Sequence, residues 1–378
     1  MLTLSTRAHT NMHEPFMAEA LRLARRGLGY TSPNPAVGAL VVKDGRVVGR
    51  GYHQHFGGPH AEAVALAEAG ARARGSTVYV TLEPCGHHGK TPPCTEALLA
   101  AGVRRVCYGM SDPDPQVASE GVAQLRRGGV EVLTGPLADE VKRFYEAYAK
   151  HRRTGKPFVT LKMALSLDGK IATREGDSHW ISSEAARAHT HRLRAEADAV
   201  MVGVGTILSD DPALTTRLPE GRGRDAAAVI VDSRARTPPG ASVFRRQAGS
   251  AVYIGVTEAA EAQRLHSLEA QGARIVCCQA QNGRVDLGEL LARLGELGML
   301  HVMCEGGGAL AASLLEAGLV DKVLFVVAPK LIGGRDAPTP VEGVGPAAIS
   351  EALDLRDLRV ERVGPDVLLE GYVCSPES

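Results

Sequence analysis

The stretch STVYVTLEPCGHHGKTPPCTEALLAAG, residues 76–102, sets a strand, a polar loop with two cysteines and a helix in succession. An apolar run ends at Leu82, Cys85 follows it, and Cys94 opens a run of helix-forming residues. A thiolate at a helix N-terminus is stabilised by the helix dipole and by free backbone N–H groups, which lower its pKa. Two cysteines in polar, proline-rich sequence therefore favour metal binding over packing.

The stretch GGPHAEAVAL, residues 57–66, supplies a histidine and a glutamate after a proline that can open a helix. His60, Cys85 and Cys94 together offer three zinc ligands and leave one tetrahedral position open, as catalytic zinc sites do. Side chains two residues apart point about 200° apart on a regular helix, so we interpret Glu62 as an acid and base beside the metal, not as a fourth ligand. Glu62 would take a proton from the attacking water and give it to the leaving group.

The spacing of the cysteines leaves an alternative open. Zinc deaminases commonly pair His-x-Glu with a later Pro-Cys-x-x-Cys, whereas eight residues separate Cys85 from Cys94 in this chain. His87 and His88 lie within that insert and are rival ligands. With Cys85 and one of these histidines the zinc site could be closed and structural, and Glu62 would then have no role.

The composition of the chain argues against nucleic-acid-binding, membrane and secreted proteins. The chain has 378 residues, enough for two domains, and 43 basic residues balance 43 acidic ones. A net charge of zero argues against a large nucleic-acid-binding surface. No run reaches the roughly 18 apolar residues that cross a bilayer, and residues 1–15 lack the apolar core of a secretory signal. With seven cysteines and no such signal, we expect a cytoplasmic protein with free thiols and no membrane contact.

Hydrophobic periodicity predicts an α/β fold in the first half of the chain. The expected order is a helix, a hairpin around Asp44-Gly45, and then alternating helices and strands. That order predicts a mixed sheet with helices on both faces. The expected helices are 13–27, 60–73, 94–101, 116–127 and 137–152, and the expected strands are 36–42, 46–52, 76–82, 103–109 and 130–133.

The stretch KHRRTGKPF, residues 150–158, is charged, contains glycine and proline, and has no apolar face. We place the domain boundary there, between residues 1–150 and 151–378. A second alternation of apolar runs follows it and predicts a second α/β domain. Its expected strands are 158–165, 199–204, 227–232, 251–256, 273–278, 301–305 and 322–327, with a final pair within 358–373.

Glycine-rich turns in the second domain favour phosphate binding. HVMCEGGGALAASLLEAG, residues 301–318, places Glu305 and three glycines between a strand and a helix, where free N–H groups can hold a phosphate. Ala311 stands where a dinucleotide fingerprint has its third glycine, so a tight turn is the alternative. Residues 201–217, MVGVGTILSDDPALTTR, also run from a strand into a glycine turn.

The stretch VIVDSRAR, residues 229–236, ends a strand with Ser233 and sets two arginines beside it. Arg234 or Arg236 could pair with the 2′-phosphate of NADP, because a guanidinium matches phosphate oxygens. A solvated pair of surface arginines is the alternative.

The first domain closely resembles the pyrimidine deaminase of riboflavin biosynthesis, a family that uses the long cysteine spacing. The resemblance is carried by TSPNPAVGALVV, GYHQHFGGPHAEAVAL and VTLEPCGHHGKTPPCTEALLAAG, residues 31–42, 51–66 and 80–102. It implies a cytidine-deaminase-like domain in which His60, Cys85 and Cys94 bind one zinc ion per chain. It also implies that Glu62 carries the proton and that Asn34 lies near the pyrimidine, although Asn34 could equally be a turn residue before Pro35.

The second domain resembles the reductase half of the bifunctional deaminase–reductase of the same pathway, whose fold is like that of dihydrofolate reductase. The matching runs are LKMALSLDGKIAT, SHWISS, VGVGTILSDDPALTTR, VIVDS and EGGGAL. Together the two resemblances cover residues 13–373. They imply NADPH contacts from Ala164, Trp180, Thr206, Asp210, Ser233, Gly307, Gly308, Ala309, Leu310, Ala311, Ala312 and Ser313, and substrate contacts from Ser178, Arg194, Leu214, Arg217 and Glu305.

The reaction that the resemblance implies has two steps. The diaminopyrimidinone ring of 2,5-diamino-6-ribosylamino-4(3H)-pyrimidinone 5′-phosphate is first deaminated hydrolytically. NADPH then reduces the ribosyl side chain, giving 5-amino-6-ribitylaminouracil 5′-phosphate. Arg194 and Arg217 suit the substrate phosphate, and Lys162, Asp210 or water could supply the proton of the reduction. The expected partner is this small molecule, and we expect a homo-oligomer.

Three other functions are weighed against this one. A nucleic-acid deaminase of the tRNA-editing type shares the zinc chemistry but needs a basic groove, which the balanced charge disfavours. A binding module with a structural zinc would need a fourth protein ligand. A chain with one working half is disfavoured because both sets of residues are present.

Overall fold

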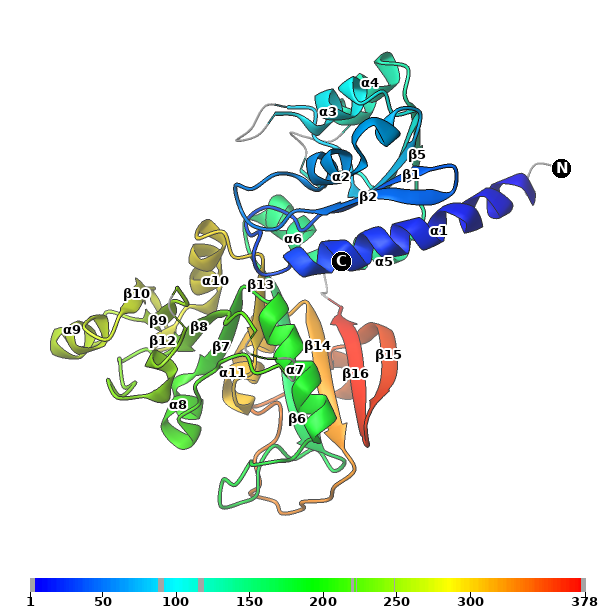
Figure 1. Ribbon diagram of the computed structural model, residues 1–378. Coiled ribbons are helices and arrows are strands. Elements are labelled where there is room, and N and C mark those ends of the chain that lie inside the picture. The colour runs from blue at the N-terminus through cyan, green and yellow to red at the C-terminus, as the bar shows by residue number, and fades with distance from the viewer. Residues whose placement is uncertain are drawn as a thin grey trace. The chain divides into compact units, whose positions relative to one another are not determined.

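The computed structural model describes residues 4–87, 92–114, 119–218, 221, 223–247 and 249–374. It divides into two compact units, Met1–Gly155 and Lys156–Ser378, and each contains its own sheet (Figure 1). The α/β class expected for both halves is confirmed by these two mixed sheets with helices. In the described part of the chain, no helix is long and apolar enough to cross a membrane.

The first unit is built on a five-stranded sheet in the order β2-β1-β3-β4-β5. β1 pairs antiparallel with both β2 and β3, whereas β3, β4 and β5 run parallel. The strands are β1 (Gly38–Lys43), β2 (Arg46–Tyr52), β3 (Thr77–Leu82), β4 (Arg105–Met110) and β5 (Glu131–Thr134), and the helices are α1 (Leu4–Ala24), α2 (Ala61–Ala69), α3 (Cys94–Ala100), α4 (Glu120–Arg127), α5 (Ala138–Phe144) and α6 (Glu146–Thr154).

Successive residues of β3 point to opposite faces of this sheet. Val78 and Val80 belong to the apolar core that α2, α3 and α4 cover, while Tyr79 between them packs against Phe16 of α1 on the other face. Gly51 in β2 lets α2 approach closely, since a Cβ at Gly51 would lie 2.2 Å from the carbonyl oxygen of Ala61. This contact fixes the first turn of α2 against the sheet.

The second unit is built on a nine-stranded sheet in the order β10-β9-β8-β7-β13-β6-β14-β16-β15. All neighbours pair in parallel except β16, which is antiparallel to both β14 and β15. The strands are β6 (Phe158–Ser166), β7 (Ala199–Gly203), β8 (Ala227–Val231), β9 (Val252–Val256), β10 (Ala273–Cys277), β13 (His301–Cys304), β14 (Lys322–Ala328), β15 (Leu355–Val363) and β16 (Asp366–Val373).

Helices cover both faces of the second sheet as well. One apolar core joins the sheet to α10 and α11, and another joins it to α8 and α9. The helices are α7 (Glu184–Glu196), α8 (Val204–Asp210), α9 (Ala262–Glu269), α10 (Leu287–Glu296) and α11 (Gly308–Glu316). Ligands of such sheets bind beyond the carboxyl ends of the parallel strands. We therefore expect the ligand site in the loops after β6, β7, β8 and β13.

Several element boundaries differ from those expected. α1 begins at Leu4 and continues through Pro15, and the helix expected over 137–152 is two helices that break at Tyr145. The helix expected over 116–127 begins at Glu120, and residues 115–118 lie outside the described part of the chain. The sequence patterns did not indicate α8, which starts directly after β7, or the short hairpin of β11 (Ala280–Gln281) and β12 (Arg284–Val285).

Candidate functional site

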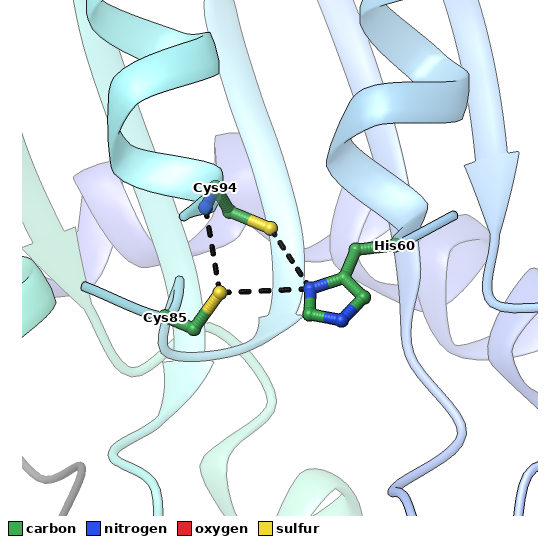
Figure 2. Close-up of side chains that lie close together, drawn as sticks. All are labelled: His60, Cys85 and Cys94. Atoms are coloured by element: carbon green, nitrogen blue, oxygen red, sulfur yellow. Dashed lines mark hydrogen bonds between the residues drawn. The ribbon is translucent and has the colours of Figure 1, made fainter. Parts of the chain in front are cut away.

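Three elements of the first unit bring His60, Cys85 and Cys94 together (Figure 2). His60 is the residue before α2 and has an extended backbone, Cys94 is the first residue of α3, and Cys85 lies in the loop after β3. Their ligand atoms all lie within 4.8 Å of one another. Nδ1 of His60 is 3.2 Å from Sγ of Cys94 and 3.5 Å from Sγ of Cys85.

The chemistry of this donor set fits zinc. Two sulfurs and one imidazole nitrogen are the ligands of catalytic Cys₂His sites, which need deprotonated thiols and a neutral imidazole. Hydrogen bonds from the side chain of Cys94 lower the pKa of the Cys85 thiol to about 4, with further bonds from His60 and the Cys94 backbone. The lowered pKa favours the thiolate form of Cys85, while its hydrogen bond to Cys85 raises the pKa of the Cys94 thiol. Nδ1 of His60 is the nitrogen that faces both sulfurs.

His87, one of the two rival ligands in the insert, is not part of this cluster. Among the described residues the only group of metal-binding side chains is His60, Cys85 and Cys94, and His87 is exposed. His88 lies outside the described residues. In the described part of the chain the cluster therefore contains the three expected ligands and no fourth.

Glu62 lies in the first turn of α2, where only 4% of its surface is exposed. Burial is the main cause that raises the pKa of its carboxyl to about 7, and the charge of Cys85 adds to it. A hydrogen bond also joins the carboxyl to the side chain of Cys94. A carboxyl that binds and releases a proton near neutral pH, in contact with a candidate metal ligand, is suited to general acid–base catalysis.

A pocket of about 340 Å³ opens beside these residues, and both Glu62 and His60 line it. Asn34 also lines the pocket, and its Nδ2 lies 3.5 Å from Nε2 of His53. His53, which follows β2 directly, was not singled out from the sequence, although a histidine at the end of a strand is a usable signal. Further polar lining residues that were missed from the sequence include Glu83, Asp112, Asp114, Tyr148 and Arg152.

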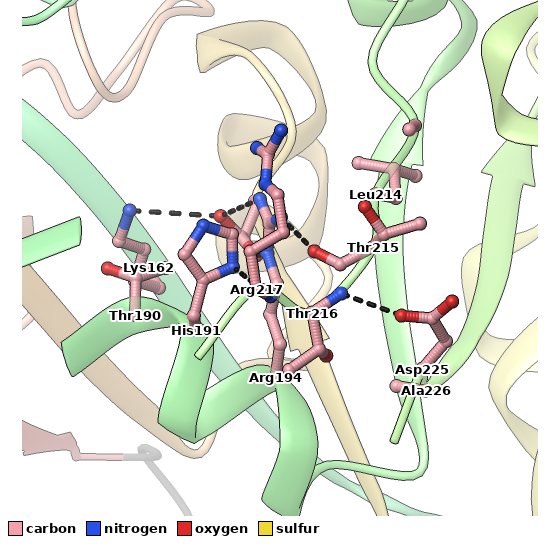
Figure 3. Close-up of polar contacts among 12 residues, drawn as sticks. Lys162, Thr190, His191, Arg194, Leu214, Thr215, Thr216, Arg217, Asp225 and Ala226 are labelled. Atoms are coloured by element: carbon pink, nitrogen blue, oxygen red, sulfur yellow. Dashed lines mark hydrogen bonds and ion pairs between the residues drawn. The ribbon is translucent and has the colours of Figure 1, made fainter. Parts of the chain in front are cut away.

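In the second unit two cationic side chains, Arg194 and Lys162, lie beside the carboxylate of Glu305. Arg194 and Lys162 are both labelled in Figure 3. Glu305 directly follows β13 at its carboxyl end, Arg194 comes from α7, and Lys162 comes from β6. Nε and Nη2 of Arg194 lie 2.6 and 3.0 Å from the two carboxylate oxygens of Glu305. Nζ of Lys162 lies 3.7 Å from Oε2 of Glu305.

The three side chains of this cluster are mostly buried, so their charges interact strongly. The side chains of Glu305, Lys162 and Arg194 are 10%, 11% and 15% exposed. Burial alone would raise the pKa of Glu305, but the charges of Arg194 and Lys162 lower it to about 2. Burial lowers the pKa of Lys162, and the charge of Glu305 opposes that shift.

The residues expected to contact NADPH lie at the carboxyl ends of parallel strands. Gly307 precedes α11, and the run from Gly308 to Ser313 forms the first turns of that helix, directly after β13. Thr206 and Asp210 lie on α8 after β7, Ser233 follows β8, and Ala164 lies near the end of β6. Because parallel strands share one carboxyl edge, these segments meet along the same edge of the sheet as Glu305.

The remaining expected contacts lie in loops. Ser178 and Trp180 follow β6; Trp180 is 64% exposed, and the guanidinium carbon of Arg187 stacks 4.1 Å from its ring centre. Leu214 and Arg217 lie in the loop after α8, where Leu214 is buried and Arg217 is exposed. Arg234 and Arg236 are both exposed after β8.

Two family models match the chain. The cytidine and deoxycytidylate deaminase zinc-binding region matches residues 10–110, and the RibD C-terminal domain matches residues 157–369.

Similar proteins span almost the whole chain. Riboflavin biosynthesis protein RibD of Actinobacillus pleuropneumoniae is 41% identical over 361 residues, which cover 96% of this chain and 95% of that protein. RibD of Escherichia coli K12 is 40% identical over 367 residues, covering 94% and 98% of the two chains.

Solved structures agree with this similarity. A structure of Acinetobacter baumannii RibD superposes with a TM-score of 0.85 at 35% identity, covering 97% of this chain and 100% of that one. A structure from Thermotoga maritima, described as a diaminohydroxyphosphoribosylaminopyrimidine deaminase/5-amino-6-(5-phosphoribosylamino)uracil reductase, superposes with a TM-score of 0.83 at 36% identity and the same coverage.

Proposed function

Because this chain belongs to the RibD family of riboflavin biosynthesis, which joins a zinc-binding deaminase domain to a reductase domain, we propose which of its residues carry each reaction. The chain is a bifunctional enzyme, a deaminase and an NADPH-dependent reductase. We infer that it deaminates the diaminopyrimidinone ribosylamino phosphate and then reduces the ribosyl side chain, as the description of the Thermotoga maritima protein suggests. Deamination is assigned to the first unit and reduction to the second.

In the first unit, His60, Cys85 and Cys94 hold the zinc ion, and Glu62 carries the proton. Zinc, when bound, polarises the attacking water and lowers its pKa. Glu62 accepts the proton of that water and donates it to the departing ammonia, because its buried carboxyl has a pKa near the working pH. Asn34, on the wall of the same pocket, hydrogen-bonds the pyrimidine ring.

In the second unit, the ribosyl phosphate substrate binds beside the cluster of Glu305, Arg194 and Lys162. NADPH supplies the hydride that reduces the ribose C1 carbon. Arg217 is exposed on its loop and pairs with the phosphate, while Ser178 and Leu214 line the same subsite. Lys162 is favoured over Asp210 as the proton donor, since Lys162 is buried beside Glu305 with a lowered pKa and Asp210 is exposed.

NADPH contacts are assigned along the carboxyl edge of the second sheet. The backbone N–H groups of Gly307 and the residues after it lie at the N-terminus of α11. A helix N-terminus favours the binding of a phosphate. The further contacts proposed are Ala164, Trp180, Thr206, Asp210, Ser233 and the remaining residues of the run Gly307 to Ser313.

The single observation that carries the deaminase assignment is the meeting of His60, Cys85 and Cys94 beside the buried Glu62. Of these residues, His60, Cys85 and Glu62 line one pocket. The test is to incubate the purified, zinc-loaded chain with the diaminopyrimidinone ribosylamino phosphate and to follow the products by mass spectrometry. Without NADPH the deaminated uracil should accumulate, and with NADPH the ribityl product should replace it. Reduction of the substrate before deamination, or no deamination at all, would contradict the assignment.

Self-association is proposed for the second unit. β15 is the last strand of its sheet, and eight of its nine residues are exposed. Leu358 is 58% and Val360 66% exposed on that strand, and an exposed apolar edge strand is a template for pairing with another chain. We therefore infer a homo-oligomer that buries β15. Light scattering of the wild type and of a Leu358→Lys, Val360→Lys variant tests it, and an unchanged mass of the variant would contradict it.

We also infer that the chain works in the cytoplasm on small molecules. All seven cysteines are free, and two of them belong to the candidate zinc site, which suits a reducing compartment. The balanced charge supports the absence of a nucleic-acid partner.

A further inference from the structure

The loop that carries Leu214 and Arg217 is fixed at three consecutive backbone groups. Nη1 of Arg194 donates to the carbonyl oxygen of Thr215 over 3.0 Å. The next N–H, that of Thr216, donates to Oδ1 of Asp225 over 2.7 Å, and the N–H of Arg217 donates to Nδ1 of His191 over 3.3 Å (Figure 3). Three side chains therefore hold one short segment: Arg194 and His191 from α7, and Asp225 from the loop before β8.

The segment needs this support because its first residue is strained. Leu214 has a φ of +50°, in the left-handed region that residues with a side chain rarely adopt. Leu214 is also 95% buried, so its side chain fixes the strained backbone in place. Such a conformation persists only where surrounding contacts hold it, and strained backbone is frequent at ligand-binding sites.

His191 lies on α7 three residues before Arg194, so both side chains project from the same face of the helix. Because its Nδ1 accepts the N–H of Arg217, the ring proton must be on Nε2 and the imidazole must be neutral.

The charged groups that face His191 favour this neutral form. They are Arg194 on its own helix, Arg217 on the loop, Lys162 on β6 and Glu305 after β13. Burial, and then the two arginines, lower the pKa of His191 to about 4. The acceptor is therefore available throughout the neutral range.

We propose that His191 is a positioning residue of the reductase: by accepting the Arg217 N–H it holds the segment Leu214–Arg217 in the conformation that meets the phosphate of the substrate. This rests on the proposed role of Arg217 and Leu214 in substrate binding. His191 acts through the loop and not on the reacting atoms, so its loss weakens the binding of the pyrimidine phosphate. The turnover of bound substrate and the binding of NADPH depend on other segments.

A matched pair of variants separates the hydrogen bond from packing. His191→Leu keeps a side chain of similar bulk without an acceptor, and His191→Asn places an amide oxygen near the position of Nδ1. In the full-length chain, with the deaminated substrate and NADPH, His191→Leu should raise the KM for the pyrimidine phosphate about tenfold, the loss expected for one unsatisfied N–H. His191→Asn should stay within about threefold of the wild type.

Four further measurements make the test specific. The KM for NADPH and the deaminase rate, which belongs to the other unit, should be unchanged in both variants. The KM of the wild type should rise as the pH approaches 4, where His191 gains a proton and stops accepting, and the Asn variant should lack that extra rise. Arg217→Ala tests the underlying assignment: an unchanged KM there overturns the role of the loop itself.

If Arg217→Ala raises the KM but His191→Leu does not, the loop binds substrate and the positioning role of His191 is overturned. An Asn variant as impaired as the Leu variant, or equal increases in the KM for both substrates, also overturns it.

Discussion

Arg194 and Glu305 face each other as a two-pronged ion pair, with Nε 2.6 Å from Oε1 and Nη2 3.0 Å from Oε2. The third nitrogen of Arg194 donates to the carbonyl oxygen of Thr215. Each nitrogen of the guanidinium is thus engaged within the protein. We therefore expect the exposed Arg217 to make the main phosphate contact, while Arg194 orients Glu305 and the loop.

Removing the carboxylate should destabilise the second unit. Glu305→Gln leaves the charges of Arg194 and Lys162 buried without their counter-charge, and such a loss costs about 3–5 kcal/mol. Denaturant unfolding followed by a probe in the second unit measures the loss of free energy. The double variant Arg194→Met, Glu305→Gln should lose less than the sum of the single changes, because the pair is then removed together. Additive losses would mean that the pair does not act as a unit.

The same carboxylate should make the second unit acid-sensitive. The pKa of Glu305 is about 2 in the folded chain, against 4.5 as its ordinary value. A lowered pKa stabilises the folded state fully above pH 4.5, and this contribution is lost as the pH falls from 4.5 towards 2. The free energy of unfolding should fall over that interval in the wild type and fall less steeply in Glu305→Gln. Parallel pH curves for the two chains would contradict the prediction.

Cys94→Ser should remove the zinc ion and inactivate the first unit, while the second unit keeps its activity. A serine hydroxyl is a far weaker zinc ligand than a thiolate, so metal content should fall from one ion per chain towards zero and deamination should be lost. The reductase rate on the deaminated substrate should persist, since its residues lie in the other unit. Metal analysis and both assays on one preparation decide this. His87→Ala is the control, and it should keep its zinc, because His87 is exposed and outside the cluster.

The sequence predicted the positions of sheets and helices better than the relationships between side chains. Apolar periodicity and glycine turns placed most strands to within two residues, and the cysteine spacing with His60 predicted the cluster that the structure brings together. α8 was missed because a short helix after a glycine turn has too few residues for a periodic pattern. α1 starts nine residues before the expected position, since Pro15 in its middle is a breaker signal that packing overrides.

Contacts between residues that are far apart in the chain could not be predicted from the sequence. Glu305 and Arg194 are 111 residues apart, and no local pattern indicates that one satisfies the other. The positive φ of Leu214 was also unpredictable, because the contacts that hold the next two residues come from α7 and from Asp225. His191 carried no motif, and only its neighbours in space give it a role.

Glu62→Gln should separate proton transfer from zinc binding. The amide keeps the size of the side chain but cannot accept the proton, and loss of general acid–base catalysis lowers rates about 10²–10⁴-fold. Zinc content should stay at one ion per chain if Glu62 is not a ligand. Loss of zinc in this variant would instead make Glu62 a ligand and would contradict its role as proton carrier.

The preference for NADPH over NADH should depend on an arginine after β8. Oγ of Ser233 accepts the N–H of Val285 over 3.0 Å, and within the described part of the chain its hydroxyl proton has no acceptor, so it can donate to a 2′-phosphate. Arg234 and Arg236 are exposed on the same turn, and among the described residues neither forms an ion pair. A charged hydrogen bond contributes about 1.5–3 kcal/mol, so losing it should weaken NADPH binding about 10- to 100-fold.

Two variants, Arg234→Ala and Arg236→Ala, identify the arginine that binds the 2′-phosphate. Each is measured with both cofactors. NADH lacks the 2′-phosphate, so its KM should change little in either variant, and the ratio of the two KM values is the diagnostic. We expect the larger change for Arg234, which is adjacent to Ser233 in the chain. Equal losses for NADPH and NADH would indicate general damage to the loop. No change in either variant would mean that the phosphate is held elsewhere along the edge, where the first turn of α11 offers free N–H groups.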